Sequence, residues 1–186
     1  FPNTHESVII MGIMKSSISK DSLQFLYNIL SPKMKMSKYA KIVEVYLREK
    51  ILSIGDTYYD FMALDTSGRK TKLSMHLGKY ILLDFTSAFC GPCIKSAKEL
   101  RFISKSYSDS LSVISLSGDI KKEVWLNSLK RDSTNWVCLW DGKGAYSETF
   151  IKYGVHSFPS FVLLDPNGLI IDKFTGYDVG YLIKKL

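Results

Sequence analysis

The fold is decided by residues 80–93, which read YILLDFTSAFCGPC. Asp84 alone interrupts an apolar run at residues 80–85, and a short run of this kind predicts a buried strand. The run leads into a C-x-x-C motif at residues 90–93, and a helical pattern follows from residue 94 to about residue 107. A strand, a turn with two cysteines and a helix together favour thiol-disulfide chemistry.

Short apolar runs separated by turn residues extend this unit in both directions. Two hairpins are predicted, one around the turn at residues 65–68 and one around Pro-Asn-Gly at residues 166–168. A parallel βαβ unit followed by an antiparallel ββα unit predicts an α/β fold, with a central mixed sheet flanked by helices and an N-terminal β-hairpin. We expect strands at residues 61–64, 70–73, 80–85, 111–116, 160–165 and 169–174, and helices at about 94–107, 121–130, 146–153 and 178–186.

Residues 1–50 differ from the rest because their apolar residues recur at helical spacing. One helix follows Ser19 and ends near Pro32, and a second amphipathic helix covers residues 37–50. We therefore expect a helical extension at 1–50 before a domain at 51–186. No apolar stretch approaches the roughly 20 residues that cross a bilayer, so we expect no transmembrane segment in this chain.

The distribution of charge along the sequence argues against a nucleic-acid-binding protein. The net charge is +7, from 25 Lys and Arg against 18 Asp and Glu, but the cations alternate with carboxylates and no basic run exceeds two residues. A surface that follows phosphates needs clustered cations. No nucleic-acid partner is expected.

The two cysteines of the motif fit the roles that disulfide exchange requires. Cys90 lies at the start of a helix, where the helix dipole and free N–H groups stabilise a thiolate, so it is the expected nucleophile. Cys93 lies one turn later as the resolving thiol, and Pro92 suits the first helical turn. Asp84, buried in the strand, is the expected proton acceptor of Cys93, since burial raises a carboxyl pKa towards neutrality. The alternative is that Asp84 forms an ion pair with a buried lysine.

Several segments resemble the extracytoplasmic thioredoxin-like reductases of the TlpA and ResA type. The resemblance covers the chain from about residue 51 to its end, in ILLDFTSAFCGPC, IGDTYYDF, GKYILLDF, YGVHSFPSFVLLDPNG and Thr175-Gly176. It implies a thioredoxin fold, oxidised protein substrates, a membrane or soluble dithiol electron donor, and no cofactor beyond the cysteine pair. It also implies a periplasmic or other extracytoplasmic location, with any membrane tether outside this chain.

LSPKMKMSKYAKIVEVYL, at residues 30–47, is similar to the helical segment that precedes the thioredoxin domain in Bacteroidetes members of the family. In those proteins the segment links a small β-rich domain to the thioredoxin domain. No such β-rich domain precedes it in this sequence, so we expect the chain to be a fragment of a longer protein.

The same resemblance identifies residues that contact the substrate. Pro159 corresponds to the family's cis-proline, which lies opposite the cysteine pair, and Phe158 and Phe89 are neighbours that depart from the family's usual residues. Gly91 and Pro92 complete the expected contact surface. The Gly-Pro dipeptide resembles that of the reducing members, which predicts a reductase.

Three other interpretations stay open at this point. A zinc site would need Cys138 and His156 beside the C-x-x-C motif, although structural zinc sites want four close ligands. Peroxiredoxin chemistry is the second interpretation. The resemblance implies that this chemistry would need a threonine two residues nearer to Cys90 than Thr86 is. Cys138 itself is expected to be an unreactive core residue. The third is a thioredoxin-like interaction module without catalysis, and within the redox class the chain could instead be a disulfide oxidase or isomerase.

Overall fold

The computed structural model describes residues 3–186, so the first two residues of the expected extension lie outside it. The helices are α1 (His5–Met14), α2 (Lys20–Asn28), α3 (Pro32–Lys35), α4 (Lys38–Arg48), α5 (Gly91–Ser106), α6 (Lys122–Arg131), α7 (Glu148–Lys152) and α8 (Tyr181–Lys185), with a short 3-10 helix at Leu73–His76. The strands are β1 (Met62–Leu64), β2 (Lys70–Lys72), β3 (Tyr80–Thr86), β4 (Leu111–Ser117), β5 (Val137–Trp140), β6 (Ser160–Leu164) and β7 (Ile170–Thr175).

The strands form one mixed sheet in the order β2-β1-β5-β4-β3-β6-β7. Strand β4 pairs in parallel with β3 and with β5, whereas β6 runs antiparallel to β3 and to β7. The β1–β2 hairpin joins the edge through Leu64 opposite Trp140. The expected fold class, with its mixed sheet, flanking helices and N-terminal hairpin, is confirmed.

Strand β3 lies inside the sheet and has both faces covered. Side chains alternate between the faces of a strand. Ile81 and Phe85 pack with Phe150, carried by α7, on one face, whereas Leu82 packs with Leu100, carried by α5, on the other. Asp84 is two residues after Leu82, so its side chain lies on the same face of the sheet as Leu82, towards α5.

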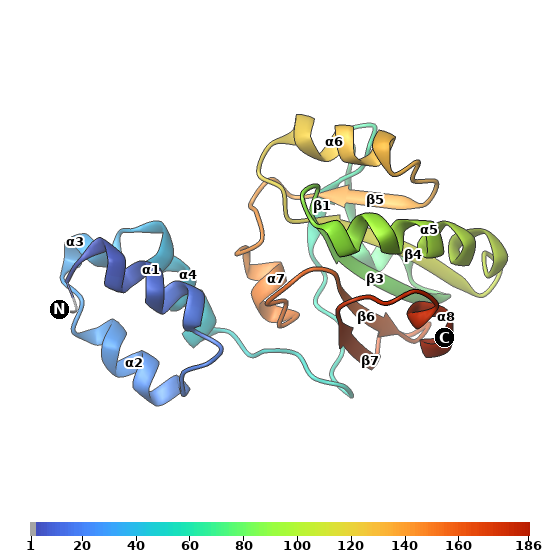
Figure 1. Ribbon diagram of the computed structural model, residues 1–186. Coiled ribbons are helices and arrows are strands. Elements are labelled where there is room, and N and C mark those ends of the chain that lie inside the picture. The colour runs from blue at the N-terminus through green and yellow to red at the C-terminus, as the bar shows by residue number, and fades with distance from the viewer. Residues whose placement is uncertain (1–2) are drawn as a thin grey trace.

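The four N-terminal helices α1–α4 gather beside the sheet with a core of their own, as the blue part of Figure 1 shows. Serine side chains cap three of them, since Ser19, Ser31 and Ser37 each accept a hydrogen bond from a first-turn N–H group. The core of these helices contains Val8, Met11, Leu23, Leu30, Met34, Ala40, Ile42, Val43 and Tyr46, together with Ile151 from α7. Helix α7 thus belongs to two cores at once.

Polar and aromatic contacts add to this attachment of the N-terminal helices to α7. Lys152 pairs with Glu49 at 2.9 Å, and the carbonyl of Lys152 accepts a hydrogen bond from the backbone N–H of Leu52 at 2.8 Å. The rings of Tyr39 and Tyr146 meet edge to face with centroids 6.5 Å apart. The helices are therefore fixed against α7 and the segment before it.

The structure differs from the sequence-based expectation in two places. Four helices, not two, occupy the N-terminal part, because α1 has apolar residues around its whole circumference and α3 has only four residues. Strand β5 was not predicted because it is only four residues long and all four are apolar, so no alternation marks it as a strand. Within residues 3–186, no helix is both long and apolar enough to cross a bilayer.

We expect Ile151→Ala to lower the free energy of unfolding by roughly 2–5 kcal/mol, the usual range for emptying a buried isoleucine site. Ile151 is 3% exposed in the core of the N-terminal helices. Hydrogen exchange should show α1–α4 losing more protection than β3. The matched control is Ile171→Ala on β7, where the side chain is 38% exposed. Equal losses for the two variants would contradict the shared core.

Candidate active site

Cys90 and Cys93 form a disulfide across the first turn of α5. Cys90 is the N-cap residue, and its Sγ accepts a hydrogen bond from the backbone N–H of Cys93 at 3.2 Å. Cys90 is partly exposed, whereas Cys93 is only 5% exposed. The more exposed cysteine therefore lies at the positive end of the helix, where a thiolate is favoured.

Asp84 is buried beneath this turn, with 2% of its surface exposed. Its Oδ2 accepts a hydrogen bond from Ser115 Oγ at 2.6 Å, and Trp136 Nε1 donates in turn to that hydroxyl at 2.8 Å. Its Oδ1 has no hydrogen-bond partner among residues 3–186. Burial raises the pKa of Asp84 to about 7, and the Ser115 hydrogen bond opposes part of that rise. The alternative of an ion pair with a buried lysine is not observed among residues 3–186, where Asp84 is hydrogen-bonded to a serine.

Asp84 and Cys93 line the same small cavity, of about 30 Å³, behind the disulfide. This volume is enough for about one water molecule where polar groups surround it. Strand pairing sets Asp84 beside Ser115 and Ser115 beside Cys138, and all three line this cavity. A proton could pass between the Cys93 thiol and the Asp84 carboxylate through such a water.

Cys138 is a free cysteine in β5 and is 3% exposed. Burial raises the pKa of its thiol to about 12, so it stays protonated at neutral pH. Among residues 3–186, no group of three or more His, Cys, Asp or Glu side chains is placed to share a metal ion. Although Cys138 lines the same cavity as Cys93, Cys138 and His156 thus form no metal-binding group with the cysteine pair among these residues.

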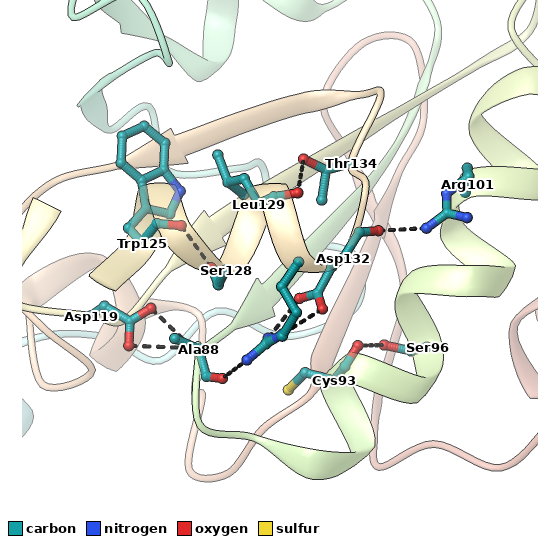
Figure 2. A network of polar contacts seen from close by, with 11 residues as sticks. Ala88, Cys93, Ser96, Arg101, Asp119, Trp125, Ser128, Leu129, Asp132 and Thr134 are labelled. Carbon is teal, nitrogen blue, oxygen red and sulfur yellow. Dashed lines mark hydrogen bonds and ion pairs between the residues drawn. The ribbon is translucent and has the colours of Figure 1, made fainter. Parts of the chain in front are cut away.

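Asp119 and Arg131 hold the loop between β3 and Cys90 through Ala88, and Figure 2 shows Asp119 beside Ala88. Asp119 accepts from the backbone N–H of Ala88 at 3.0 Å and from Ser87 Oγ at 2.9 Å. Arg131 donates through Nη1 to the carbonyl of Ala88 at 2.8 Å. The guanidinium also binds both carboxylate oxygens of Asp132 at 2.7 Å. Both backbone groups of Ala88 are therefore fixed two residues before Cys90.

The residues expected to meet the substrate lie in two loops. Phe89 is 85% exposed beside the disulfide, and Gly91 and Pro92 are also exposed. The Phe158–Pro159 peptide bond is cis, as the family resemblance predicts. Pro159 itself is buried, and its carbonyl accepts a hydrogen bond from the Gly176 N–H at 2.9 Å.

The Phe158 side chain turns inward. Its ring meets Phe150 edge to face at 5.9 Å, and its Cζ would lie 2.8 Å from a Cβ at Gly118. Its backbone N–H and carbonyl have no hydrogen-bond partner among residues 3–186. The part of Phe158 available to a substrate is therefore its backbone more than its ring.

Sequence reasoning missed Ser115, Asp119, Arg131 and Trp136. The first two lie in β4 or just after its carboxyl end, where polar residues near the ends of parallel strands often form sites. That signal could have identified Asp119. Nothing local to Arg131 or Trp136 indicates that they reach the site, because their contacts depend on the packing of α6 and β5.

We expect Asp84→Asn to raise the free energy of unfolding at pH 8 by about 2–4 kcal/mol, since a pKa difference of one unit corresponds to about 1.4 kcal/mol. The buried carboxyl has a raised pKa, so the wild type loses stability as pH rises from about 4 to about 7, where the unfolded chain ionises first. The variant cannot ionise and should lose less.

Urea unfolding of the oxidised proteins between pH 4 and pH 8 checks this. The exposed Asp109→Asn variant is the control and should follow the wild type. A difference between wild type and Asp84→Asn that is constant across this pH range would mean that ionisation of Asp84 is not its cause.

We expect Gly118→Ala to destabilise the protein by roughly 1–3 kcal/mol, the usual effect of overpacking. The added methyl would meet the Phe158 ring at 2.8 Å and the backbone of Ala145 at 3.3 Å. Thermal unfolding measures the loss, and a second change, Phe158→Leu, should restore part of it. Gly91→Ala is the control because its Cβ would meet nothing within 4 Å. No rescue by the shorter side chain would refute the contact.

Comparison with known proteins agrees with this site. The thioredoxin-like family model (Thioredoxin_8) matches residues 78–170, half of the chain. The thioredoxin-like protein YneN of Bacillus subtilis is 28% identical over 140 residues, which cover 73% of this chain and 79% of that protein. The thiol-disulfide oxidoreductase ResA of Bacillus thuringiensis is 26% identical over 132 residues, which cover 70% of this chain and 75% of ResA.

Solved structures give the same result. The thioredoxin domain of a thiol-disulfide oxidoreductase from Bacteroides vulgatus superposes with a TM-score of 0.64 at 25% identity, covering 72% of this chain and 97% of that domain. A thiol-disulfide oxidoreductase from Bacteroides fragilis gives a TM-score of 0.62 at 27% identity, covering 70% of this chain and 98% of that chain. The chain therefore belongs to the thioredoxin-like family and is a thiol-disulfide oxidoreductase of the TlpA and ResA type.

Proposed function

We propose that this protein reduces disulfides in protein substrates with the Cys90–Cys93 dithiol. The supporting observation is the asymmetry of the pair: Cys90 is partly exposed at a helix N-terminus, and Cys93 is buried in a cavity that it shares with Asp84. One sulfur is placed to attack, and the other is placed to exchange a proton with a carboxyl whose pKa is about 7. We also propose that residues 51–186 form the catalytic domain and that residues 1–50 are an extension of it.

In the first step, the Cys90 thiolate attacks one sulfur of the substrate disulfide. A bond forms between Cys90 Sγ and that sulfur, and the substrate's own S–S bond breaks. The released substrate thiolate takes up a proton from water. The Cys93 N–H, 3.2 Å from Cys90 Sγ in the disulfide form, is placed to stabilise the attacking thiolate.

In the second step, Cys93 resolves the mixed disulfide. Its thiol gives its proton to the Asp84 carboxylate, and the thiolate then attacks Cys90 Sγ. The Cys90–Cys93 bond forms, the second substrate thiolate leaves, and two electrons have passed to the substrate. An external dithiol donor must then reduce the pair again. Asp84 suits this role because a proton acceptor works best when its pKa lies near the working pH.

The substrate would lie across the two loops that flank Cys90. Phe89, Gly91 and Pro92 offer an exposed surface on one side. The free backbone groups of Phe158, which precedes Pro159, can pair with an extended substrate segment on the other side, as edge backbone groups commonly do. The resemblance to TlpA and ResA proteins favours oxidised extracytoplasmic proteins as substrates and a membrane dithiol as donor.

The test is a redox titration against reduced and oxidised dithiothreitol or glutathione, followed by alkylation and mass measurement. We expect a two-electron couple near the value of thioredoxin, about −270 mV, rather than that of the oxidant DsbA, about −120 mV. Cys93→Ser should accumulate a mixed disulfide through Cys90 with a peptide disulfide, whereas Cys90→Ser should form none. A potential near the DsbA value would reverse the direction of the reaction. No disulfide at any ratio would refute the redox assignment.

A further inference from the structure

A second cavity, of about 190 Å³, lies where the N-terminal helices meet the loop that leads to Pro159. It takes side chains from the end of α1, from the segment before α7 and from the loop after α7. We call it the Lys15 pocket. Its polar side chains are Lys15, Ser16, Tyr146, His156 and Ser157, and Phe158 is shared with the proposed substrate loop.

Lys15 is an unusual residue for such a position because it is only 5% exposed. Its Nζ donates a hydrogen bond to the carbonyl of Gly12 at 3.3 Å and lies 5.2 Å from the centroid of the Tyr146 ring. No carboxylate of residues 3–186 lies within 4 Å of it. Buried charges are normally paired, and contact with a ring does not neutralise the ammonium.

Lys173 is a further cation whose charge acts near the pocket, and the neutral form of His156 is favoured there. His156 stands at the rim, and its pKa is lowered first by burial and then by the charges of Lys15 and Lys173. Burial also lowers the pKa of Lys15. No Asp or Glu is among the side chains that line the pocket. The pocket thus offers an ammonium, an imidazole and three hydroxyls as donors, and its lining within residues 3–186 contains no carboxylate.

We infer that the Lys15 pocket binds a carboxylate of the substrate polypeptide, supplied by an acidic side chain near the substrate's reactive cysteine. This inference rests on the proposed reduction of protein disulfides. The pocket is smaller than the roughly 300–1,000 Å³ of typical small-molecule sites, so a single side chain fits it better than a whole ligand. Because Phe158 lines the pocket directly before Pro159, a segment lying along that loop would pass its mouth.

A carboxylate in the pocket would supply the charge that Lys15 lacks. Its oxygens could accept hydrogen bonds from the ammonium and the hydroxyls, and such charge-assisted bonds are the stronger kind. The N-terminal helices would then be part of the substrate-binding site, since Lys15 and Ser16 directly follow α1. Their function would be selection of acidic substrates, and the chemistry would stay with the cysteine pair.

The experiment uses synthetic disulfide peptides in matched pairs that differ only by Glu or Gln, with this residue moved through successive positions on either side of the reactive cysteine. The reduced wild-type chain should reduce the best Glu peptide with a kcat/KM roughly tenfold above its Gln partner, as expected for a charge-assisted contact. Lys15→Met should lower this ratio to below about twofold. Lys20→Met is the matched control: Lys15 lies 6.0 Å from the centroid of the Tyr46 ring and Lys20 lies 5.5 Å from it, but Lys20 does not line the pocket.

A second variant keeps the test valid if Lys15→Met proves to fold poorly. His156→Glu changes an exposed rim residue and places a carboxylate near Lys15, so it should abolish the Glu preference without entering a core. Lys15→Met should melt no lower than the wild type, because removing a buried unpaired charge does not destabilise the free protein.

Three outcomes would overturn the inference in different ways. If wild-type protein reduces the Glu and Gln peptides equally at every position, the pocket does not bind substrate carboxylates, and the proposed reductase function stands. If it reduces neither peptide while the Cys90–Cys93 pair still exchanges with dithiothreitol, the proposed function and this inference fail together. Retention of the Glu preference in Lys15→Met would also refute the role of Lys15.

Discussion

Strand β3 is paired along both edges and covered on both faces, and this enclosure sets the chemistry of the site. Its neighbours are β4 and β6, α7 covers one face, and α5 and α8 cover the other. A carboxyl in such a strand is removed from water, and within residues 3–186 the Asp84 carboxyl receives one hydrogen bond in compensation, from Ser115. A group in that setting holds its proton up to neutral pH, because the protein offers its charged form little solvation. Enclosure of the strand thus converts an ordinary acid into a group able to exchange protons near pH 7.

The position of Cys90 depends on a different set of contacts. The chain leaves β3, turns once and begins α5, and the turn is held through Ala88 by Asp119 and Arg131. Rigid support of this kind keeps a reactive group in place without contacting it. The buried acid lies below the helix and the clamped turn lies before it, so one sulfur faces solvent and the other faces the cavity. The two cysteines differ in their surroundings although they are only three residues apart.

Sequence alone could reveal what depends on neighbours in the chain. The run before Asp84 identified the buried strand, the C-x-x-C motif identified the cysteine pair, and Pro-Asn-Gly at 166–168 identified the last hairpin. Contacts between distant segments were out of reach. Asp119 and Arg131 meet Ala88 across 31 and 43 residues, and the inward turn of Phe158 depends on the absence of a side chain at Gly118. Strand β5 is too short for its periodicity to be distinguished from that of any buried segment.

Helix α7 has a consequence for how this protein can change in evolution. Adjacent residues serve different cores: Phe150 packs against the sheet, whereas Ile151 packs among the N-terminal helices. Consecutive residues of a helix are about 100° apart, so inserting or deleting one residue here would turn both side chains away from their cores. The turn at 65–68 contributes to neither core, so its length can change without displacing a core side chain. Insertions and deletions among relatives that retain the N-terminal helices should therefore accumulate in turns of that kind and spare the five residues of α7.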